Sequence, residues 1–464
     1  MPGDVAFEQV PPGRDELGCD VLVVGAGPAG SAAAYWLARA GHDVLVLEKK
    51  HFPRAKTCGD GLTPRAVRQL EEMGLGDEIA RFHRYEGLRA IAFGRELVLA
   101  WPSHPDFPGH GYVVTRAELD ALVAAHAERA GATLWQGAEA VAPLLGGKRT
   151  ASRASATQGA AAPAGGAVVR DASSGRLREV RARYVVVADG ALSRFGRELG
   201  ARRDRSRPLG LALRGYFRSP RHAEALIESH LDIRDRHGAV VPGYGWVFPL
   251  GDGRVNVGVG LLSTSDRWRG ANTTRLMEAF LEQAPASWCL TPESSLGPPT
   301  GGRLPMGLSV GPHAGPDYLL AGDAGGSINP FNGEGIAYAL ETGRLAAEVV
   351  DEALGSGRPE ALAEYGSRLE AAYGPYYRVG SAFSRLLGRE GTMRLLVGTG
   401  MRSATVMSWV LRIMSNLLRD SELGPPEAAY RAAALASSLA ASRAASTVRA
   451  TSSSPWASEV NTTS

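Results

Sequence analysis

A cysteine and an aspartate stand two residues apart in a glycine-rich turn, as Cys58 and Asp60 of the stretch FPRAKTCGDGL, residues 52–62. The chain has three cysteines, and their wide spacing offers neither a disulfide framework nor a Cys-x-x-Cys metal pair, so we expect Cys58 to be a free thiol. A thiol with an ordinary pKa of about 8.5 is protonated at neutral pH and can donate a proton. An aspartate needs a large upward pKa shift to do the same.

A glycine motif near the start of the chain has the spacing of a dinucleotide site. It consists of Gly25, Ala26, Gly27, Pro28, Ala29 and Gly30. In such a motif the first glycine makes a tight turn, the second lets a pyrophosphate approach the backbone, and the third permits close helix–strand packing. Glu48 follows at the end of the next apolar run, where it can hydrogen-bond ribose hydroxyls. This context disfavours the alternative, a Gly-rich turn with a surface glutamate.

A second motif decides which dinucleotide is expected. In YLLAGDAGGSINPFNGEGI, residues 318–336, a predicted strand ends at Gly322-Asp323, and Gly333 and Gly335 open a long predicted helix. The aspartate can accept a hydrogen bond from a ribityl hydroxyl, and the helix N-terminus can stabilise negative charge on a reduced ring. Nicotinamide enzymes do not need this second half, so the two motifs together predict an FAD site.

With these motifs in order, the sequence resembles the FAD-dependent oxidoreductases with a p-hydroxybenzoate hydroxylase-like fold. The likeness rests on GAGPAG with Glu48, on Arg116 of TRAELD, on Asp189-Gly190 of VVVADGALSRFGR, and on Gly322-Asp323. Within that superfamily, FPRAKTCGDGL, GYGWVFPLGDGRVNVGVG and NPFNGEGI resemble the geranylgeranyl reductase family, which saturates isoprenoid double bonds. The likeness runs from about residue 19 to 420 and favours the actinobacterial members that reduce an isoprene unit of the menaquinone tail.

The resemblance implies that the Cys-Gly-Asp-Gly turn lies at the flavin. An isolated alkene is not electrophilic, so hydride transfer must be accompanied by a proton. Cys58 is the candidate donor and Asp60 a weaker one; the other interpretation is that Cys58 is a small apolar residue packed beside the flavin. The full predicted cofactor-binding set is Gly25, Ala26, Gly27, Pro28, Ala29, Gly30, Glu48, Lys49, Gly59, Gly61, Arg116, Asp189, Gly190, Gly322, Asp323, Gly333, Gly335 and Ile336.

The segment GYGWVFP is the candidate substrate wall. Aromatic residues that alternate with glycine on a strand suit a pocket for a long apolar chain, and their faces can stabilise positive charge. The resemblance assigns Tyr244, Trp246, Phe248 and Pro249 to the prenyl site. The alternative is an aromatic-rich core strand.

Several functions stay open on the sequence alone. Reductases of geranylgeranyl diphosphate or other prenyl lipids, an aromatic monooxygenase and a non-catalytic prenyl carrier share much of this pattern. A halogenase is disfavoured because Trp246 has no Trp-x-Trp partner. The electron donor is expected to be NAD(P)H or reduced ferredoxin. Ten scattered histidines give no metal-binding pattern, so no metal is expected.

The elements that position these residues indicate an α/β fold. Continuous apolar runs near residues 19–48, 111–136, 184–190 and 318–324 favour one parallel sheet of a Rossmann-like FAD-binding domain. Runs at 88–102, 208–217, 239–250 and 254–263 favour an inserted, mostly antiparallel substrate domain. After Gly335 the pattern is helical.

These patterns set the expected boundaries. The FAD-binding domain comprises 19–85, 111–200 and 315–375, the substrate domain 86–110 and 201–314, and C-terminal helices 376–436. A lead (1–18), an insert (146–166) and a Ser-rich tail (437–464) are expected to be disordered.

Charge and hydropathy set the expected location. A net charge of +3 gives no reason to expect nucleic acid as a partner. Without a signal-peptide pattern or a spanning apolar run, the protein is expected in the cytoplasm. Residues 378–419 hold seven arginines, one acid, Glu390, and many large apolar residues. This composition favours peripheral contact with the inner membrane surface; the alternative is a helix pair that closes the substrate pocket.

Overall fold

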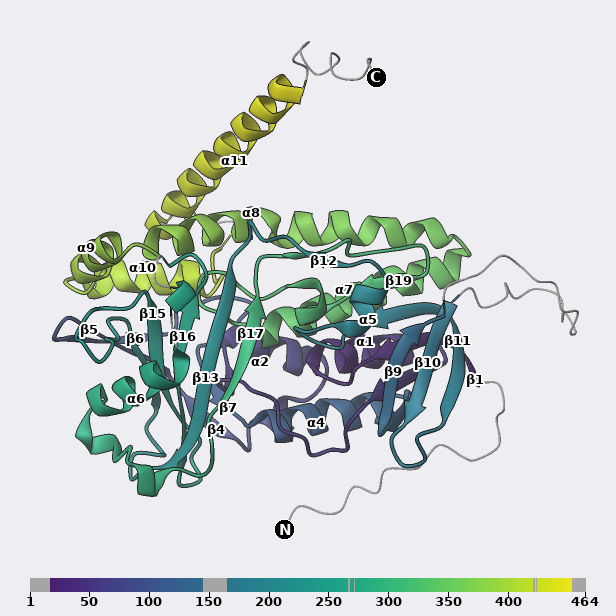
Figure 1. Ribbon diagram of the computed structural model, residues 1–464, viewed down its shortest axis with the longest axis horizontal. Coiled ribbons are helices and arrows are strands. Elements are labelled where there is room, and N and C mark those ends of the chain that lie inside the picture. The colour runs from purple at the N-terminus through teal and green to yellow at the C-terminus, as the bar shows by residue number, and fades with distance from the viewer. Residues whose placement is uncertain are drawn as a thin grey trace, which may run out of the picture.

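Two sheets lie side by side, with C-terminal helices along one edge and the last helix projecting away from the body (Figure 1). The computed structural model describes residues 17–144, 165–265, 268–270, 272–419, 422 and 424–452. The predicted α/β class, with an FAD-type sheet, a second sheet and a C-terminal helical region, is confirmed.

The first sheet has parallel strands drawn from distant parts of the chain. Its order is β8-β2-β1-β11-β10-β9, and β19 also pairs with β11. The parallel strands are β1 (Leu17–Val24), β2 (Val44–Glu48), β8 (Thr133–Gln136), β11 (Leu177–Val187) and β19 (Tyr318–Leu320), and β10 (Gly165–Asp171) and β9 (Ala138–Pro143) add an antiparallel edge. Apolar clusters bury the sheet on both faces, which explains the continuous apolar runs.

Three helices pack beside this sheet and carry the cofactor motifs. They are α1 (Pro28–Arg39), α4 (Arg116–Arg129) and α7 (Ile336–Ser356). The approach of α1 to α7 is close, because a Cβ on Gly343 of α7 would lie 2.2 Å from the Ala29 carbonyl oxygen of α1. The two FAD motifs, almost 300 residues apart in sequence, therefore meet in space.

The predicted strand in GYVVT does not join the parallel sheet. As β7 (Gly111–Val113) it forms an antiparallel sheet with β3 (Gly61–Leu62) and β4 (His83–Tyr85). In the parallel sheet, β8 occupies the edge position beside β2. Gly111 packs closely against β3, because a Cβ added to Gly111 would lie 2.3 Å from the Leu62 carbonyl oxygen. This pairing holds the Cys58 turn beside the start of α4.

The second sheet has the order β17-β13-β16-β15-β14-β5-β6, antiparallel except for β14 with β5. Its strands are β5 (Gly87–Ala92), β6 (Arg95–Ala100), β13 (Leu209–Arg218), β14 (Leu226–His230), β15 (Gly243–Pro249), β16 (Arg254–Leu262) and β17 (Thr300–Pro305). The four predicted strand segments are present, and β14 and β17 were not predicted. One face packs on α6 (Thr273–Gln283), and the other faces the cofactor motifs.

The C-terminal helices are α8 (Glu364–Leu387), α9 (Glu390–Gly400), α10 (Ala404–Met414) and α11 (Pro425–Ser452). The expectation of a disordered tail from residue 437 is wrong as far as Ser452, because α11 continues to that residue; its many alanines have the highest helix propensity. Residues 453–464, 1–16 and 145–164 lie outside the described part, whereas Gly165 and Gly166, expected in the insert, begin β10.

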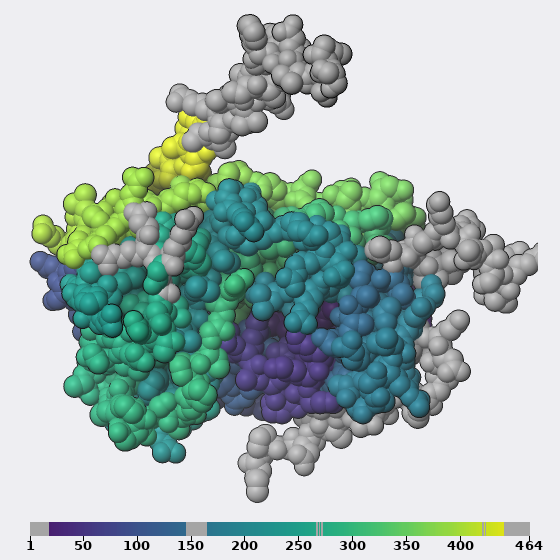
Figure 2. All heavy atoms as spheres, viewed as in Figure 1, coloured from purple at the N-terminus to yellow at the C-terminus, as the bar shows by residue number. Residues whose placement is uncertain are grey.

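The remaining short elements connect these layers: α2 (Pro64–Glu72), α3 (Gly76–Ile79), α5 (Arg194–Glu198), β12 (Arg202–Arg203), β18 (Val310–Gly311) and the 3-10 helices η1 (Trp268–Gly270), η2 (Ala286–Trp288), η3 (Pro292–Ser294), η4 (Gly322–Gly325) and η5 (Pro359–Ala363). In the described ranges, no helix has both the length and the apolar character to cross a membrane. Figure 2 shows the early part of the described chain, coloured purple, between the second sheet and the β9–β11 side.

Candidate active site

The GAGPAG turn forms a cradle in which each glycine has a separate role. Gly25 has φ +100°, and a Cβ there would lie 2.6 Å from the Ala188 carbonyl oxygen. A Cβ on Gly30 would lie 1.8 Å from the Gly25 carbonyl oxygen, so this position allows no side chain. A Cβ added to Gly27 would have open space around it, with guanidinium nitrogens of Arg54 and Arg116 nearest, at 3.9 and 4.0 Å. An open backbone turn facing two cations at a helix N-terminus fits a pyrophosphate.

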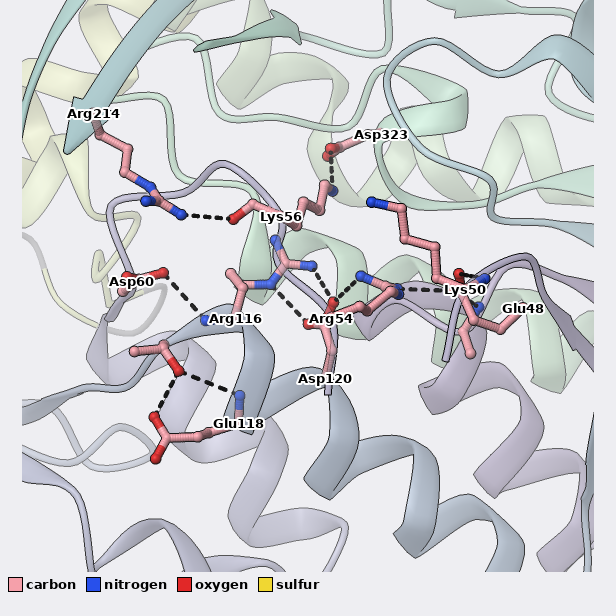
Figure 3. A network of polar contacts seen from close by, with 12 residues as sticks. Glu48, Lys50, Arg54, Lys56, Asp60, Arg116, Glu118, Asp120, Arg214 and Asp323 are labelled. Carbon is pink, nitrogen blue, oxygen red and sulfur yellow. Dashed lines mark hydrogen bonds and ion pairs between the residues drawn. The ribbon is translucent and has the colours of Figure 1, made fainter. Parts of the chain in front are cut away.

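A buried ion network surrounds this cradle (Figure 3). Arg54 bonds Glu48 at 3.0 Å and Asp120 at 2.8 Å, and Arg116 bonds Asp120 at 2.7 Å. The backbone N–H groups of Ala26 and Lys50 also donate to Glu48. The carboxylate predicted to bind ribose therefore lies against the GAGPAG turn, and Asp120 holds both arginines in place.

Arg54 and Asp120 were not among the predicted site residues. The i,i+4 spacing of Arg116 and Asp120 in TRAELD was a usable signal, because such a pair faces one side of a helix. Arg54 had no such signal, since a basic loop is ordinarily solvated. Lys49, which was predicted to bind the cofactor, is exposed.

The second FAD motif lies against the first. A Cβ on Gly322 would lie 2.8 Å from the Ala29 Cβ, and Gly322 has φ +62°. Asp323 follows in η4, where its carboxylate forms an ion pair with Lys56 Nζ at 3.1 Å. Gly335 is the N-cap of α7 next to the buried Ile336, and a Cβ on Gly335 would lie 3.5 Å from Asp323 Oδ1. The Asp323 carboxylate thus lies at the N-terminus of α7.

Asp189 and Gly190 follow β11 directly beside the Gly25 turn. Asp189 Oδ2 accepts a hydrogen bond from the Phe195 N–H at 3.2 Å, whereas Oδ1 is buried with no partner in the structure. Burial raises the pKa of Asp189. A buried acceptor without a donor is costly, so a hydroxyl of a bound cofactor is a suitable partner. The residues present therefore fit FAD.

The Cys-Gly-Asp-Gly turn brings the cofactor motifs into contact with the second sheet. Asp60 is fully buried with φ +66°, and its carboxylate accepts hydrogen bonds from Tyr216, Asn256 and the Arg116 N–H. Burial raises the pKa of Asp60. Cys58 is half-buried, and burial is also the main cause of its raised thiol pKa. Both predicted catalytic residues therefore favour the protonated form more than they would in water.

Three of the four predicted substrate residues share one face of β15. Tyr244, Trp246 and Phe248 alternate along the strand, with adjacent ring centroids 5.7 and 6.2 Å apart. The Phe248 ring lies against Gly59 and Gly61, where added Cβ atoms would lie 3.3 and 3.2 Å from it. The aromatic face of β15 is therefore in contact with the Cys58 turn.

Pro249 is the exception among the four residues predicted to line the prenyl site. The uninterrupted β15–β16 register places Pro249 opposite Val255 and puts its side chain on the face opposite to the three aromatic rings. Its proposed role in lining the prenyl site does not fit this placement. In the second sheet, sequence reasoning missed Tyr216 and Asn256; a single asparagine in the apolar run RVNVGVGLL was the available signal.

The aromatic face also contacts the loop before α7. The Tyr244 hydroxyl donates to the Asn332 carbonyl oxygen at 2.8 Å, and a Cβ on Gly333 would lie 3.6 Å from that hydroxyl. Within the described ranges, no group of three or more His, Cys, Asp or Glu side chains is arranged to hold a metal ion.

Comparisons with known proteins agree with this geometry. Residues 18–242 match the family model described as an FAD binding domain. The chain is 42% identical to the menaquinone reductase of Mycobacterium tuberculosis (strain H37Rv), covering 87% of this chain and 92% of the relative. It is 34% identical to digeranylgeranylglycerophospholipid reductase 1 of Methanopyrus kandleri, covering 72% and 81%.

Solved structures show the same fold. A geranylgeranyl bacteriochlorophyll reductase-like protein from Thermoplasma acidophilum superposes with a TM-score of 0.69 at 25% identity, covering 87% of this chain and 99% of that one. The flavin-dependent brominase Bmp2 superposes with a TM-score of 0.66 at 17% identity over 90% and 98% of the two chains, which is a likeness of fold alone.

Proposed function

The chain belongs to the geranylgeranyl reductase family of FAD-dependent oxidoreductases, and from this premise we propose that it reduces an isoprene unit in the tail of menaquinone. The identity of 42% with a menaquinone reductase, over 87% of the chain, is the observation that carries the choice of substrate. The lower identity to digeranylgeranylglycerophospholipid reductase makes a prenylated glycerophospholipid the second candidate.

The residues around the cradle divide the binding of FAD between them. The turn at Gly27, with Arg54 and Arg116, would hold the pyrophosphate, Glu48 would hold ribose hydroxyls, and Asp323 would hold the ribityl chain. When bound, FAD supplies the hydride for the double bond. The aromatic face of β15 orients the prenyl chain beside the Cys58 turn and keeps water away from it.

Cys58 is the proposed proton donor. Its raised pKa keeps the thiol protonated at neutral pH, and its turn lies against Phe248 of the aromatic face. Cys58→Ala and Cys58→Ser test this role in single-turnover reduction by enzyme whose FAD has been reduced beforehand. We expect a loss of 100-fold or more in the alanine variant, in line with the roughly 10²–10⁴-fold contribution of general acids. Near-normal rates in both variants would leave Cys58 with a packing role.

The substrate is tested in a host that makes only fully unsaturated menaquinone. Mass spectrometry of quinones extracted with and without this protein should show a gain of about two mass units for each reduced double bond, placed in the tail by fragmentation. Unchanged menaquinone, with flavin-loaded protein and a working electron donor present, would reject the quinone. Prenylated glycerophospholipids and prenyl diphosphates would then be the next substrates.

For the electron donor we propose NAD(P)H or a reduced ferredoxin. Bleaching of the flavin absorbance under anaerobic conditions, with each donor added separately, distinguishes them. A donor that leaves the flavin oxidised is rejected.

We also propose that the C-terminal helices contact the anionic inner surface of the cell membrane. Large apolar side chains are exposed there beside exposed arginines: Leu386, Leu395, Leu396, Val406 and Trp409, with Arg385, Arg389, Arg394 and Arg402. The carbonyl oxygen of Met414, at the end of α10, accepts hydrogen bonds from Asn329 and Asn332, and the Asn332 carbonyl oxygen binds Tyr244. This surface is therefore joined to the aromatic face through one loop.

Co-sedimentation with vesicles of phosphatidylglycerol tests this contact. Leu395→Glu together with Trp409→Glu should reduce the bound fraction several-fold, whereas Leu192→Glu, at an exposed leucine in the other half of the molecule, should not. Equal binding by both variants would instead favour helices that only close the pocket.

A further inference from the structure

The Asp60 carboxylate has a hydroxyl partner that leads away from the active site. Oδ2 accepts hydrogen bonds from the Tyr216 hydroxyl at 2.5 Å and from Asn256 Nδ2 at 2.8 Å, and Oδ1 accepts one from the Arg116 N–H at 3.3 Å. Of these three donors, neither the amide nor the backbone N–H gives up a proton at physiological pH. The phenol of Tyr216 is therefore the partner that can exchange a proton with Asp60.

Asn256 fixes the geometry of this contact. Trp246 Nε1 donates to Asn256 Oδ1 at 3.0 Å, so the amide nitrogen must point the other way. There it donates to the Cys58 carbonyl oxygen at 2.9 Å as well as to Asp60. Because Asn256 and Tyr216 are direct partners in the β13–β16 register, both side chains project from the same face of the sheet.

Tyr216 connects this buried group with the surface. Tyr216 is half-buried, and the guanidinium carbons of Arg214 and Arg254 lie 4.2 and 5.7 Å from the centroid of its ring. At the ends of the same two strands, Arg254, Arg218 and Asp252 line an open hollow of about 440 Å³. The Arg254 side chain thus lines this hollow and also lies over the Tyr216 ring, so this is the side from which we expect water to reach Tyr216.

Resting on the proposed reduction, we propose that Tyr216 and Asp60 form a relay that returns a proton to Cys58 after each double bond is reduced, with Asn256 as a positioning residue. Each reduction adds a hydride from the cofactor and the proton of the Cys58 thiol to the two alkene carbons and leaves a thiolate. Asp60 then passes a proton to the thiolate, and Tyr216 passes its own proton to Asp60 while it takes one from water, so that no free phenolate forms. Burial and the Asp60 charge raise the pKa of Tyr216 and disfavour the phenolate. No electrons move in these steps, and all three groups return to their starting protonation.

Burial favours this direction of transfer, and the charges around Asp60 act on it in both senses. The titratable and charged groups that face it are Cys58 on its own turn, Arg116 at the start of α4, and Tyr216 and Arg214 on β13. Burial raises the pKa of Cys58 most, and the Asp60 charge raises it further, whereas Arg116 opposes this shift. Cys58 and Asp60 stand two residues apart in one turn, and a negative charge on Asp60 raises the pKa of the Cys58 thiol, so the thiolate readily regains a proton.

Tyr216→Phe tests the relay because it removes the hydroxyl and keeps the ring. In rapid-quench reduction of menaquinone by pre-reduced enzyme supplied with excess donor, we expect a burst of two reduced double bonds per active site, one for each proton stored on Cys58 and Asp60, at a rate within about twofold of wild type. Later turnovers should be 10-fold slower or more. Asp60→Asn should give a burst of only one reduced double bond, since the amide cannot hold the exchangeable proton and Cys58 is then the only stored donor. Equal slowing of first and later turnovers, or no slowing at all, would overturn the relay.

Tyr318→Phe is the matched control. Like Tyr216→Phe, this substitution removes one tyrosine hydroxyl and keeps the ring. The Tyr318 hydroxyl donates to the Leu199 carbonyl oxygen at 3.1 Å, and Tyr318 lies on β19 in the first sheet. This variant should show no burst.

A readout without substrate separates the relay from the proposed reaction. In pH-dependent infrared difference spectra of the full chain, the carboxyl band that is lost in Asp60→Asn should titrate about one pH unit higher in Tyr216→Phe, because a donor to the carboxylate is lost. An unshifted band would overturn the Tyr216–Asp60 contact. A shifted band in a protein that reduces no prenyl lipid would confirm the contact and reject the reaction.

Discussion

The site has a cofactor half, made by the FAD motifs, and a substrate half, made by the second sheet. In the cofactor half, Gly25 and Gly30 shape a backbone turn within six residues of sequence. In the substrate half, Tyr216, Trp246 and Asn256 meet only through the register of three antiparallel strands. The first half presents a backbone turn that leaves no room for side chains at Gly25 and Gly30. The second half depends on side-chain hydrogen bonds and ring contacts. Substitutions should therefore act by steric exclusion in the first half and by uncoupling of a network in the second.

The largest effect is expected at Gly30. A Cβ at this position would overlap the Gly25 carbonyl oxygen, so Gly30→Ala should abolish FAD binding and cost about 4 kcal/mol in the free energy of unfolding. Gly18→Ala on β1 is the control, since no atom lies within 4 Å of its added Cβ. Flavin absorbance after desalting and urea unfolding measure both effects. Flavin retained by Gly30→Ala would break the distinction between the halves.

The second effect concerns Glu334, in the loop that joins the halves. Burial raises its pKa to about 7 from an ordinary value near 4.5, although the Thr63 hydroxyl, which donates to it, and the charge of Arg65 lower it. The folded protein therefore keeps a proton that the unfolded chain loses above pH 4.5. The free energy of unfolding should fall by about 3 kcal/mol between pH 4.5 and pH 7 through this group.

Glu334→Gln removes this titration. Urea unfolding at several pH values should show a flatter profile in the variant than in wild type. Parallel profiles would mean that Glu334 is ionised in the folded protein without cost.

A smaller effect is expected for Asn256→Leu in the substrate half. The substitution leaves the indole N–H of Trp246 and the Cys58 carbonyl oxygen without their partner and should cost about 2 kcal/mol. A double-mutant cycle with Tyr216→Phe should be non-additive in unfolding free energy, because both side chains bind Asp60. Additivity would show that the two contacts act independently.

The smallest effect is expected where the halves touch. A Cβ on Gly61 would lie 3.2 Å from the Phe248 ring, which can shift, so Gly61→Ala should cost about 1 kcal/mol. Phe248→Leu in the same chain should recover part of the stability. If it recovers none, the strain lies in the turn and not in the contact between the halves.

Much of the cofactor half could be predicted from the sequence because its motifs are local. A glycine motif between a strand and a helix specifies its own geometry, and Asp323 with Gly335 does the same at the start of α7. The parallel sheet followed from continuous apolar runs, because strands buried on both faces show no alternation. The strand at Gly111 was misplaced for the same reason, since a short apolar run does not reveal its partner.

What the sequence by itself determined is therefore the fold class, the FAD motifs, the position of Cys58 in its turn and the alternation of Tyr244, Trp246 and Phe248. Only the tertiary structure decided that Pro249 faces away, that Arg54 pairs with both Glu48 and Asp120, and that Asp60 is held by Tyr216 and Asn256. The physical reason is the sequence separation between the residues that interact. Backbone geometry and side-chain alternation follow from neighbouring residues, whereas burial and hydrogen-bond partners depend on strand register between segments more than 150 residues apart.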